Sequence, residues 1–441
     1  MKKYNRKSAT RWGNLKREGM LHKALFRCRL FSLKIYEMRD VEELTQQLQR
    51  YFGAQAECEG PLAASGAAVR ILGIDLTQSL TPNQVGVLLG ALSQFRIICV
   101  AGQDLQRFGL DHFERFANHW GAPVPHPNNF LRGGKSALSD GDSDGPFALI
   151  PFEQRRVAAV NLAFPGQLEC LPHESPAVLV AANFHGPIKD PQMQVGQSGS
   201  WHTDIEYEPL PIYVSMFLCH HAPTSRGPGG TWVEMPDLSD PRPYLADSDH
   251  GLLKLRKDLP LNGETSFADT AAAFASLSQE EQSELASLHL RRRLNELDEG
   301  WLAPLVRTNP RSGIQSMHSP IFASRPGVRP PVQVDGKTME VSRALLDRLE
   351  SLVLQPQFRY DHIHVAGDVT IWDNYMTLHN SPPMKSGVSS VEDARLLYRL
   401  SCKGDPAIEL PRRDSDAWLG ANIPGSYRSP QTIVNLRQEP A

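Results

Sequence analysis

The sequence predicts a mainly β fold with flanking helices, and three observations support this fold class. Four stretches read as strands separated by turns rich in Gly and Pro, over residues 177–184, 211–221, 316–323 and 364–373. Amphipathic helical patterns precede these stretches and lie between them. The sequence contains no internal repeat. A β-barrel or β-sandwich covered by helices is therefore expected.

The first part of the expected domain alternates short strands and helices. Residues 67–76 predict a strand, and a second, buried strand is expected over residues 96–103. Between them, Thr81 has the side chain of an N-cap and Pro82 occupies the first helical position. The apolar residues that follow share one helical face, and they are Val85, Leu88, Leu89 and Leu92.

A second amphipathic helix is expected over residues 110–121. Its inward side chains are the aromatic residues Phe113, Phe116 and Trp120. His112 and Glu114 lie two residues apart in the same segment, and such a pair shares a face on a strand but not on a helix. They are therefore a poor candidate for two ligands of one metal.

Helices are also expected in the second half of the chain. A helical insertion is predicted near residues 236–300, where the sequence Ser-Gln-Glu-Glu at 278–281 fits a capping box. Another helix is predicted to start near Ser342, with the apolar positions Leu345, Leu346, Leu349 and Leu352. The segment 128–147 is rich in Gly, Asn, Asp and Ser, which predicts a loop.

Both ends of the chain fall outside the predicted domain, which covers residues 67–405. Residues 1–37 carry eleven Lys and Arg against two Glu, a net charge of about +9 (11 − 2). This basic leader, assigned to residues 1–40, reads as a disordered extension or as a start upstream of the native one. The segment 406–441 is rich in Pro, Arg and Asp and predicts an extended tail.

Composition disfavours several classes of partner. The formal net charge is −3, and no apolar run approaches the roughly 18 residues that a membrane helix needs. Neither nucleic acid nor a membrane is therefore an expected partner. The six cysteines are scattered and form no C-x-x-C, which favours reduced thiols and a cytoplasmic location. The sequence leaves open whether the chain forms a homo-oligomer.

A His-x-Asp triplet in "WHTDIEYEP" (201–209) is the first candidate site. If His202 and Asp204 lie on a strand, their side chains share a face and can occupy adjacent positions around one metal. His379, which follows "TIWDN", is the best candidate for a third ligand. Two histidines and one carboxylate leave positions on a ferrous ion open for substrate chemistry. A chain with 15 His is expected to contain such a triplet by chance, so the spacing alone leaves that alternative open.

Two arginines alternate with Leu397 and Ser401 in "ARLLYRLSCKGD" (394–405). On a strand, Arg395 and Arg399 project from the same side of an otherwise apolar segment. A buried guanidinium is costly unless an anion pairs with it. The two arginines therefore predict either one or two bound carboxylate or sulfonate groups, or a pair of structural salt bridges.

Seven segments occur in one order between about residues 67 and 405: "GAAVRILGIDL", "FRIICVAGQDL", "WHTDIEYEPLP", "GPGGTWVEM", "PLVRTNPRSG", "AGDVTIWDNYMTLH" and "ARLLYRLSCKGD". Together they resemble the taurine dioxygenase (TauD/TfdA) family of Fe(II)/2-oxoglutarate-dependent oxygenases, which includes the dichlorophenoxyacetate and alkylsulfatase enzymes. The resemblance implies that family's fold, a distorted double-stranded β-helix or jelly roll. This fold agrees with the strand-rich pattern.

The resemblance also implies three groups of site residues. The residues that match the iron ligands are His202, Asp204 and His379. Those that match the 2-oxoglutarate site are Arg395 on the distal carboxylate, Thr231 as the assisting hydroxyl, and Trp372 lining the iron pocket. Those at substrate positions are Arg399, His126, Asn129 and Ser198. Because Asn129 and Ser198 depart from the taurine enzyme, taurine itself is disfavoured.

The activity that the resemblance implies is oxidation by Fe(II), 2-oxoglutarate and O₂. An unactivated C–H bond of a small anionic or zwitterionic molecule would be hydroxylated, with release of succinate and CO₂. Asp204 stands where related halogenases carry a small residue, so oxygen chemistry is favoured over chlorination. The same machinery could perform desaturation, cyclisation or oxidative decarboxylation in natural-product biosynthesis. A non-catalytic small-molecule-binding protein is the remote alternative.

Overall fold

The residues that the computed structural model describes are 40–124, 131–132, 135–136, 161–172, 175, 177–184, 195–196, 200–207, 211–226, 232–233, 249–293, 299–323, 330–385 and 387–404. All of them lie in one compact unit. The predicted leader and tail lie outside the described residues, apart from Asp40, and both stay predictions.

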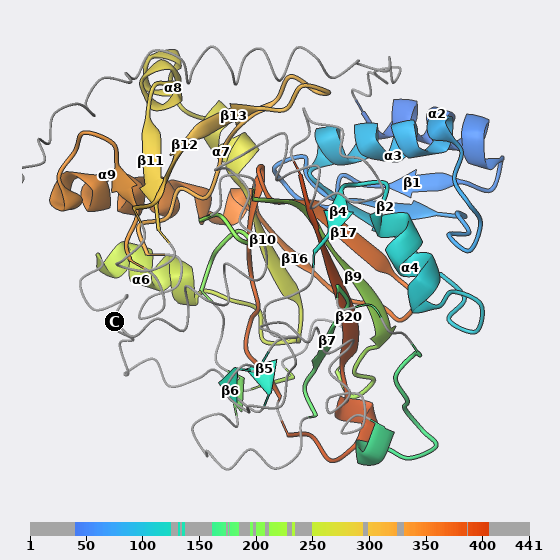
Figure 1. Cartoon of the computed structure of the whole chain (residues 1–441). Helices are drawn as coiled ribbons and strands as arrows, with labels where there is room; N and C mark the ends of the chain where they lie inside the picture. The colour runs from blue at the N-terminus through green and yellow to red at the C-terminus, as the bar shows by residue number, and fades with distance from the viewer. Residues whose placement is uncertain are drawn as a thin grey trace, which may run out of the picture. The chain divides into compact units, whose positions relative to one another are not determined.

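An eight-stranded mixed sheet is the largest sheet of the described chain. Seven strands follow one another in the order β1, β2, β3, β17, β9, β20 and β4, and β7 also pairs with β20. Their bounds are β1 Glu57–Glu59, β2 Val69–Leu72, β3 Ile97–Val100, β4 Ala122–Pro123, β7 Leu179–Ala182, β9 Ile212–His221, β17 Val369–Asp373 and β20 Leu396–Lys403. The β2 and β3 strands are parallel, whereas β20 runs antiparallel to β9, its neighbour in Figure 1.

Three helices pack on this sheet through a shared apolar core: α2 (Val41–Phe52), α3 (Pro82–Phe95) and α4 (Leu110–Ala117). Thr81 caps α3 as predicted, because its Oγ1 accepts from Gln84 N at 3.4 Å while Gln84 Oε1 accepts from Thr81 N at 2.8 Å. The three aromatic side chains predicted to face inward at α4 are all buried, and they are Phe113, Phe116 and Trp120. The fold begins before residue 67, because Leu44 and Leu48 of α2 are fully buried in the same core.

A separate three-stranded sheet has the order β16, β10, β18. These strands span Arg359–His362, Thr265–Asp269 and Thr377–Asn380 respectively. The region near 236–300 was predicted as a helical insertion, and its helices are α6 (His250–Lys257), α7 (Thr270–Ala275) and α8 (Gln279–Ala286). The prediction is incomplete, because β10 lies in the same region and all five of its residues are buried. An alanine-rich helix follows β10 directly, so the helical pattern hides the short strand.

The remaining described elements surround a second apolar core. They are β11 (His289–Arg292), β12 (Trp301–Pro304), β13 (Val306–Thr308), β14 (Gln315–Met317), β15 (Gln333–Val334), α9 (Met339–Val353) and the short η4 (Pro356–Phe358). Helix α9 begins slightly before the predicted Ser342, because Thr338 accepts from Val341 N as its N-cap. Ser278 forms the predicted capping box of α8.

Short elements complete the described chain. They are the β5–β6 pair (Leu131–Arg132 and Lys135–Ser136), the β8–β19 pair (Val195–Gly196 and Met384–Lys385) and η5 (Val391–Asp393). Most of the predicted loop 128–147 lies outside the described residues. No helix within the described ranges is long and apolar enough to cross a membrane.

Candidate metal centre

The two predicted histidine ligands come from segments that meet through their backbones. His379 is the third residue of β18, and His202 lies in a single antiparallel bridge opposite it. The bridge consists of His202 N donating to His379 O at 3.1 Å and His379 N donating to His202 O at 2.9 Å. The two rings consequently lie together, with their centroids 4.3 Å apart.

The Asp204 side chain extends toward the two histidine rings from a turn. The condition that His202 and Asp204 share a strand is not met, because Asp204 begins the turn at 204–207. The next residue, Ile205, has φ +51, a left-handed conformation that is uncommon for a β-branched side chain. Asp204 N donates to Asn374 Oδ1 at 3.2 Å, so the buried Asn374 side chain holds the start of the turn.

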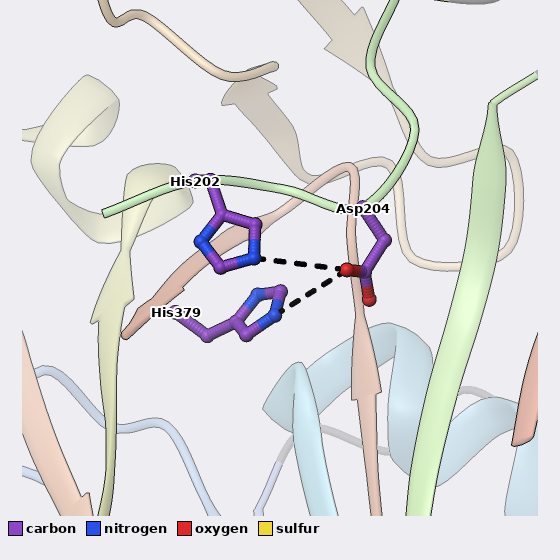
Figure 2. A group of neighbouring side chains, drawn as sticks. All are labelled: His202, Asp204 and His379. Atoms are coloured by element: carbon purple, nitrogen blue, oxygen red, sulfur yellow. Dashed lines mark ion pairs between the residues drawn. The ribbon is translucent and has the colours of Figure 1, made fainter. Parts of the chain in front are cut away.

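The three side chains point toward one another (Figure 2). Asp204 Oδ1 lies 3.8 Å from His202 Nε2 and 3.6 Å from His379 Nε2. Nδ1 of His202 lies 2.7 Å from Ser200 O, and a carbonyl only accepts, so Nδ1 carries the proton and Nε2 keeps its lone pair. Within the described part of the chain, these residues form the one group of His, Cys, Asp and Glu whose ligand atoms lie close enough to hold a metal, within 4.8 Å of one another.

The second oxygen of Asp204 is held by other side chains. Arg399 Nη2 donates to Oδ2 in a largely buried ion pair, and Ser215 Oγ donates to the same oxygen at 2.5 Å. Burial raises the pKa of the Asp204 carboxyl, but the charge of Arg399, with smaller contributions from the two histidines, outweighs burial and holds that pKa well below its usual range. The carboxylate is therefore ionised, with Oδ1 directed toward the two imidazoles.

Trp372 lies beside this cluster, as predicted for a residue that lines the pocket. It is fully buried on β17, and its ring centroid is 5.2 Å from that of His379 and 5.4 Å from that of Phe267 on β10. Phe217 on β9 adds a third aromatic ring, 5.1 Å from Trp372. The cluster thus lies where the large sheet and the β16–β10–β18 sheet meet, against an apolar aromatic wall.

Arg395 and Arg399 have different surroundings, although both belong to the predicted pattern. Arg399 forms the ion pair with Asp204, which is the structural alternative left open by the sequence. Arg395 lies just before β20, is 6% exposed and forms no salt bridge with any described carboxylate. Among the described residues, its Nη1 donates to the sulfur of Met384 at 3.5 Å and its Nε has no hydrogen-bond partner.

The charge of Arg395 is weakly compensated. Burial lowers the pKa of its guanidinium to about 10, while Cys219 and Glu264 oppose this shift and Arg226 adds to it. A buried cation in this state is a favourable place for a guest carboxylate, which would supply the missing charge and hydrogen bonds.

The sequence prediction missed Thr265, a buried residue that opens β10. Its Oγ1 lies 2.7 Å from His364 Nε2, and the charge of Arg395 is the strongest electrostatic influence on His364. The residue lies in the stretch assigned to a helical insertion, so the sequence offered only a Thr after the turn-forming Gly263. The other predicted site residues, Thr231, His126, Asn129 and Ser198, lie outside the described residues.

Comparisons with known proteins agree on one family. The family model "Taurine catabolism dioxygenase TauD, TfdA family" matches residues 59–400. An (S)-phenoxypropionate/alpha-ketoglutarate-dioxygenase of Sphingobium herbicidovorans is 27% identical over 172 residues, which are 34% of this chain and 55% of that protein. Pentalenolactone F synthase of Streptomyces arenae is 29% identical over 143 residues, 26% of this chain and 46% of that protein.

Among solved structures, a taurine dioxygenase from Burkholderia xenovorans aligns with 80% of this chain and 90% of its own, at 20% identity and a TM-score of 0.48. The chain spans about half the length of the curated relatives that it matches. The family model, in contrast, covers well over half of the chain. The chain belongs to the TauD/TfdA family of taurine catabolism dioxygenases.

Proposed function

We propose that this chain is an Fe(II)- and 2-oxoglutarate-dependent dioxygenase that hydroxylates an unactivated C–H bond of a small anionic or zwitterionic molecule and releases succinate and CO₂. The observation that carries the proposal is the buried cluster of His202, Asp204 and His379, together with Arg395, a buried cation without a described carboxylate partner. Family membership supports the same activity.

The donor set fits a ferrous ion. Two imidazoles and one carboxylate form the facial triad that leaves positions open on non-haem iron. Arg399 and Ser215 hold Asp204 Oδ2, so Oδ1 is free to face the ion together with the lone pair of His202 Nε2. The ferrous ion with 2-oxoglutarate and O₂ supplies the oxidation of the C–H bond, which protein side chains cannot perform. The protein holds the ligands, excludes water with Trp372 and Phe217, and positions the two organic molecules.

Arg395 would hold the distal carboxylate of 2-oxoglutarate. Arg395→Ala removes a charge-assisted contact that contributes roughly 1.5–3 kcal/mol net. The concentration of 2-oxoglutarate needed for half-maximal succinate formation should therefore rise at least about tenfold. The exposed Arg107, which pairs with Asp75 at the surface, gives a control variant, Arg107→Ala, that should leave this requirement unchanged. Equal requirements in Arg395→Ala and the parent would assign the carboxylate to another cation, such as Arg226.

We further propose that Thr265 supplies the hydroxyl of this site in place of Thr231, which the resemblance implied. Thr265 is buried and bonded to a histidine in the neighbourhood of Arg395. Thr265→Val should raise the requirement for 2-oxoglutarate about tenfold, because a hydrogen bond to a charged group is lost. Thr265→Ser should stay close to the parent. A tenfold effect in Thr231→Val with none in Thr265→Val would restore the first assignment.

The substrate is expected to be a small anion or zwitterion read by Arg399, His126, Asn129 and Ser198. The name of the Sphingobium relative gives phenoxypropionate, a carboxylate, as what that protein acts on. The name of the Streptomyces relative keeps the alternative of another oxidation in natural-product synthesis open. We also infer that the two sheets around the metal cluster form a distorted double-stranded β-helix, and that the protein acts in the cytoplasm without nucleic acid or a membrane as partner. Whether it forms a homo-oligomer stays open.

Succinate formation tests the activity. The purified protein with Fe(II), ascorbate and 2-oxoglutarate should form succinate slowly, and a screen of small carboxylates, sulfonates and zwitterions should reveal molecules that accelerate it. Product analysis then separates hydroxylation from desaturation or cyclisation. Absence of both ferrous binding and succinate would favour the non-catalytic alternative.

A further inference from the structure

Residues 362–365 reverse the usual relation between polarity and burial. His362 and His364 are 3% and 1% exposed, whereas the intervening Ile363 and Val365 are 49% and 46% exposed. Imidazoles are buried here while aliphatic side chains face outward. Burying a polar group without a hydrogen bond is costly, so each buried ring needs partners or a function.

The two histidines differ in their partners. His362 uses both ring nitrogens, since Nε2 lies 2.8 Å from Thr370 Oγ1 and Nδ1 lies 3.0 Å from the Tyr360 hydroxyl. His364 uses only Nε2, 2.7 Å from Thr265 Oγ1, and its Nδ1 has no hydrogen-bond partner in the part of the chain that the structure describes. His362 is therefore fully explained as a structural residue, and His364 is not.

The surroundings of His364 keep its ring neutral. Burial lowers its pKa well below the usual range, and the charges of Arg395, His362 and Arg226 act in the same direction. Arg226 also donates to the backbone carbonyl of His364, which ties this residue to the cationic neighbourhood. A neutral imidazole carries one N–H. Nδ1 has no acceptor for an N–H among the described residues, whereas Nε2 faces the Thr265 hydroxyl oxygen, so the proton resides on Nε2.

The tautomer of His364 determines whether the Thr265 hydroxyl donates or accepts in their hydrogen bond. A proton on Nε2 makes His364 the donor and Thr265 Oγ1 the acceptor in their hydrogen bond. The hydroxyl proton of Thr265 is then free to donate elsewhere, and an anion beside Arg395 is the acceptor that this neighbourhood favours. We propose that His364 is a positioning residue that directs the Thr265 hydroxyl toward the 2-oxoglutarate carboxylate held by Arg395. The inference rests on the proposed function.

A double-mutant cycle on 2-oxoglutarate binding tests it. Dissociation constants would be measured by calorimetry on the Mn(II)-loaded protein without oxygen, so that turnover does not contribute. His364→Leu and Thr265→Val should each weaken binding about tenfold, by the loss of one hydrogen bond to a charged group. Because His364 acts through Thr265, the double variant should also bind about tenfold more weakly, rather than about a hundredfold. His364→Gln, whose amide can replace the Nε2–H donor, should bind like the parent.

His362→Leu is the matched control, because this ring is equally buried but has both nitrogens satisfied within the protein. It should lower the melting temperature and leave the dissociation constant unchanged. Unaltered binding in His364→Leu, or additive losses in the double variant, would overturn the positioning role, the second because His364 would then bind the guest itself. Failure of the parent protein to bind 2-oxoglutarate would instead overturn the proposed function and this inference with it.

Discussion

Replacing His379 with alanine should abolish ferrous binding and turnover while the protein stays folded. The ring is one of three candidate ligands, and loss of a ligand should weaken metal binding by more than the roughly 10- to 100-fold that loss of a group supporting a ligand costs. The fold should survive because β18 is held by backbone pairing with β10 and with His202, which an alanine retains. The same loss of activity is expected for His202→Ala.

Titration with Fe(II) or Mn(II), together with succinate formation, checks this result. His221→Ala is a suitable control, because this histidine lies at the end of β9 and its ring contacts the backbone of Val391. Undiminished activity in His379→Ala would contradict the assignment of His379 as a metal ligand. His362 and His364 are not substitutes for it, because both contact threonine hydroxyls and neither joins a metal-binding group within the described ranges.

The three candidate ligands could be predicted from the sequence only with the help of the family resemblance, because the His-x-Asp spacing alone left chance occurrence open. Their arrangement could not. A shared strand would place the side chains of His202 and Asp204 on one face, whereas the structure uses one backbone bridge and a turn with a left-handed Ile205. Such a turn depends on Asn374, about 170 residues away, whose amide holds Asp204 N. Contacts of this range leave no periodic pattern in the sequence.

Strand β10 is an element of the fold that the sequence likewise did not predict. Its five residues carry no alternation, since all are buried between β16 and β18. A short buried run before an Ala-rich helix reads as part of that helix. Thr265 was not singled out for this reason, and its contact with His364 is apparent only from the structure. The helix start at Thr81 was predicted correctly because a capping box is a local signal.

Replacing Arg399 with methionine should destabilise the metal-free protein more than the metal-loaded protein. The Arg399 and Asp204 side chains are 14% and 6% exposed, so their ion pair is largely buried. Removing one partner of a buried pair costs about 3–5 kcal/mol, because the remaining charge is left uncompensated. A divalent ion on Asp204 Oδ1 supplies positive charge to the same carboxylate. The melting temperature of Arg399→Met should therefore fall by several degrees without metal and by much less with Mn(II).

Arg399→Lys separates the ion pair with Asp204 from the proposed second role of Arg399, which is to bind an anionic group of the substrate. Lysine keeps the charge opposite Asp204 but loses the planar fork that can hold Asp204 with one nitrogen and a substrate anion with the others. Nε of Arg399 has no hydrogen-bond partner within the described ranges, which leaves the guanidinium a donor for such a guest. The lysine variant should then bind the primary substrate more weakly, while substrate-free consumption of 2-oxoglutarate stays largely unchanged. If the melting temperature falls and the constants for both molecules shift together, the pairing with Asp204 is the whole role of Arg399, and the substrate anion must be held by another residue.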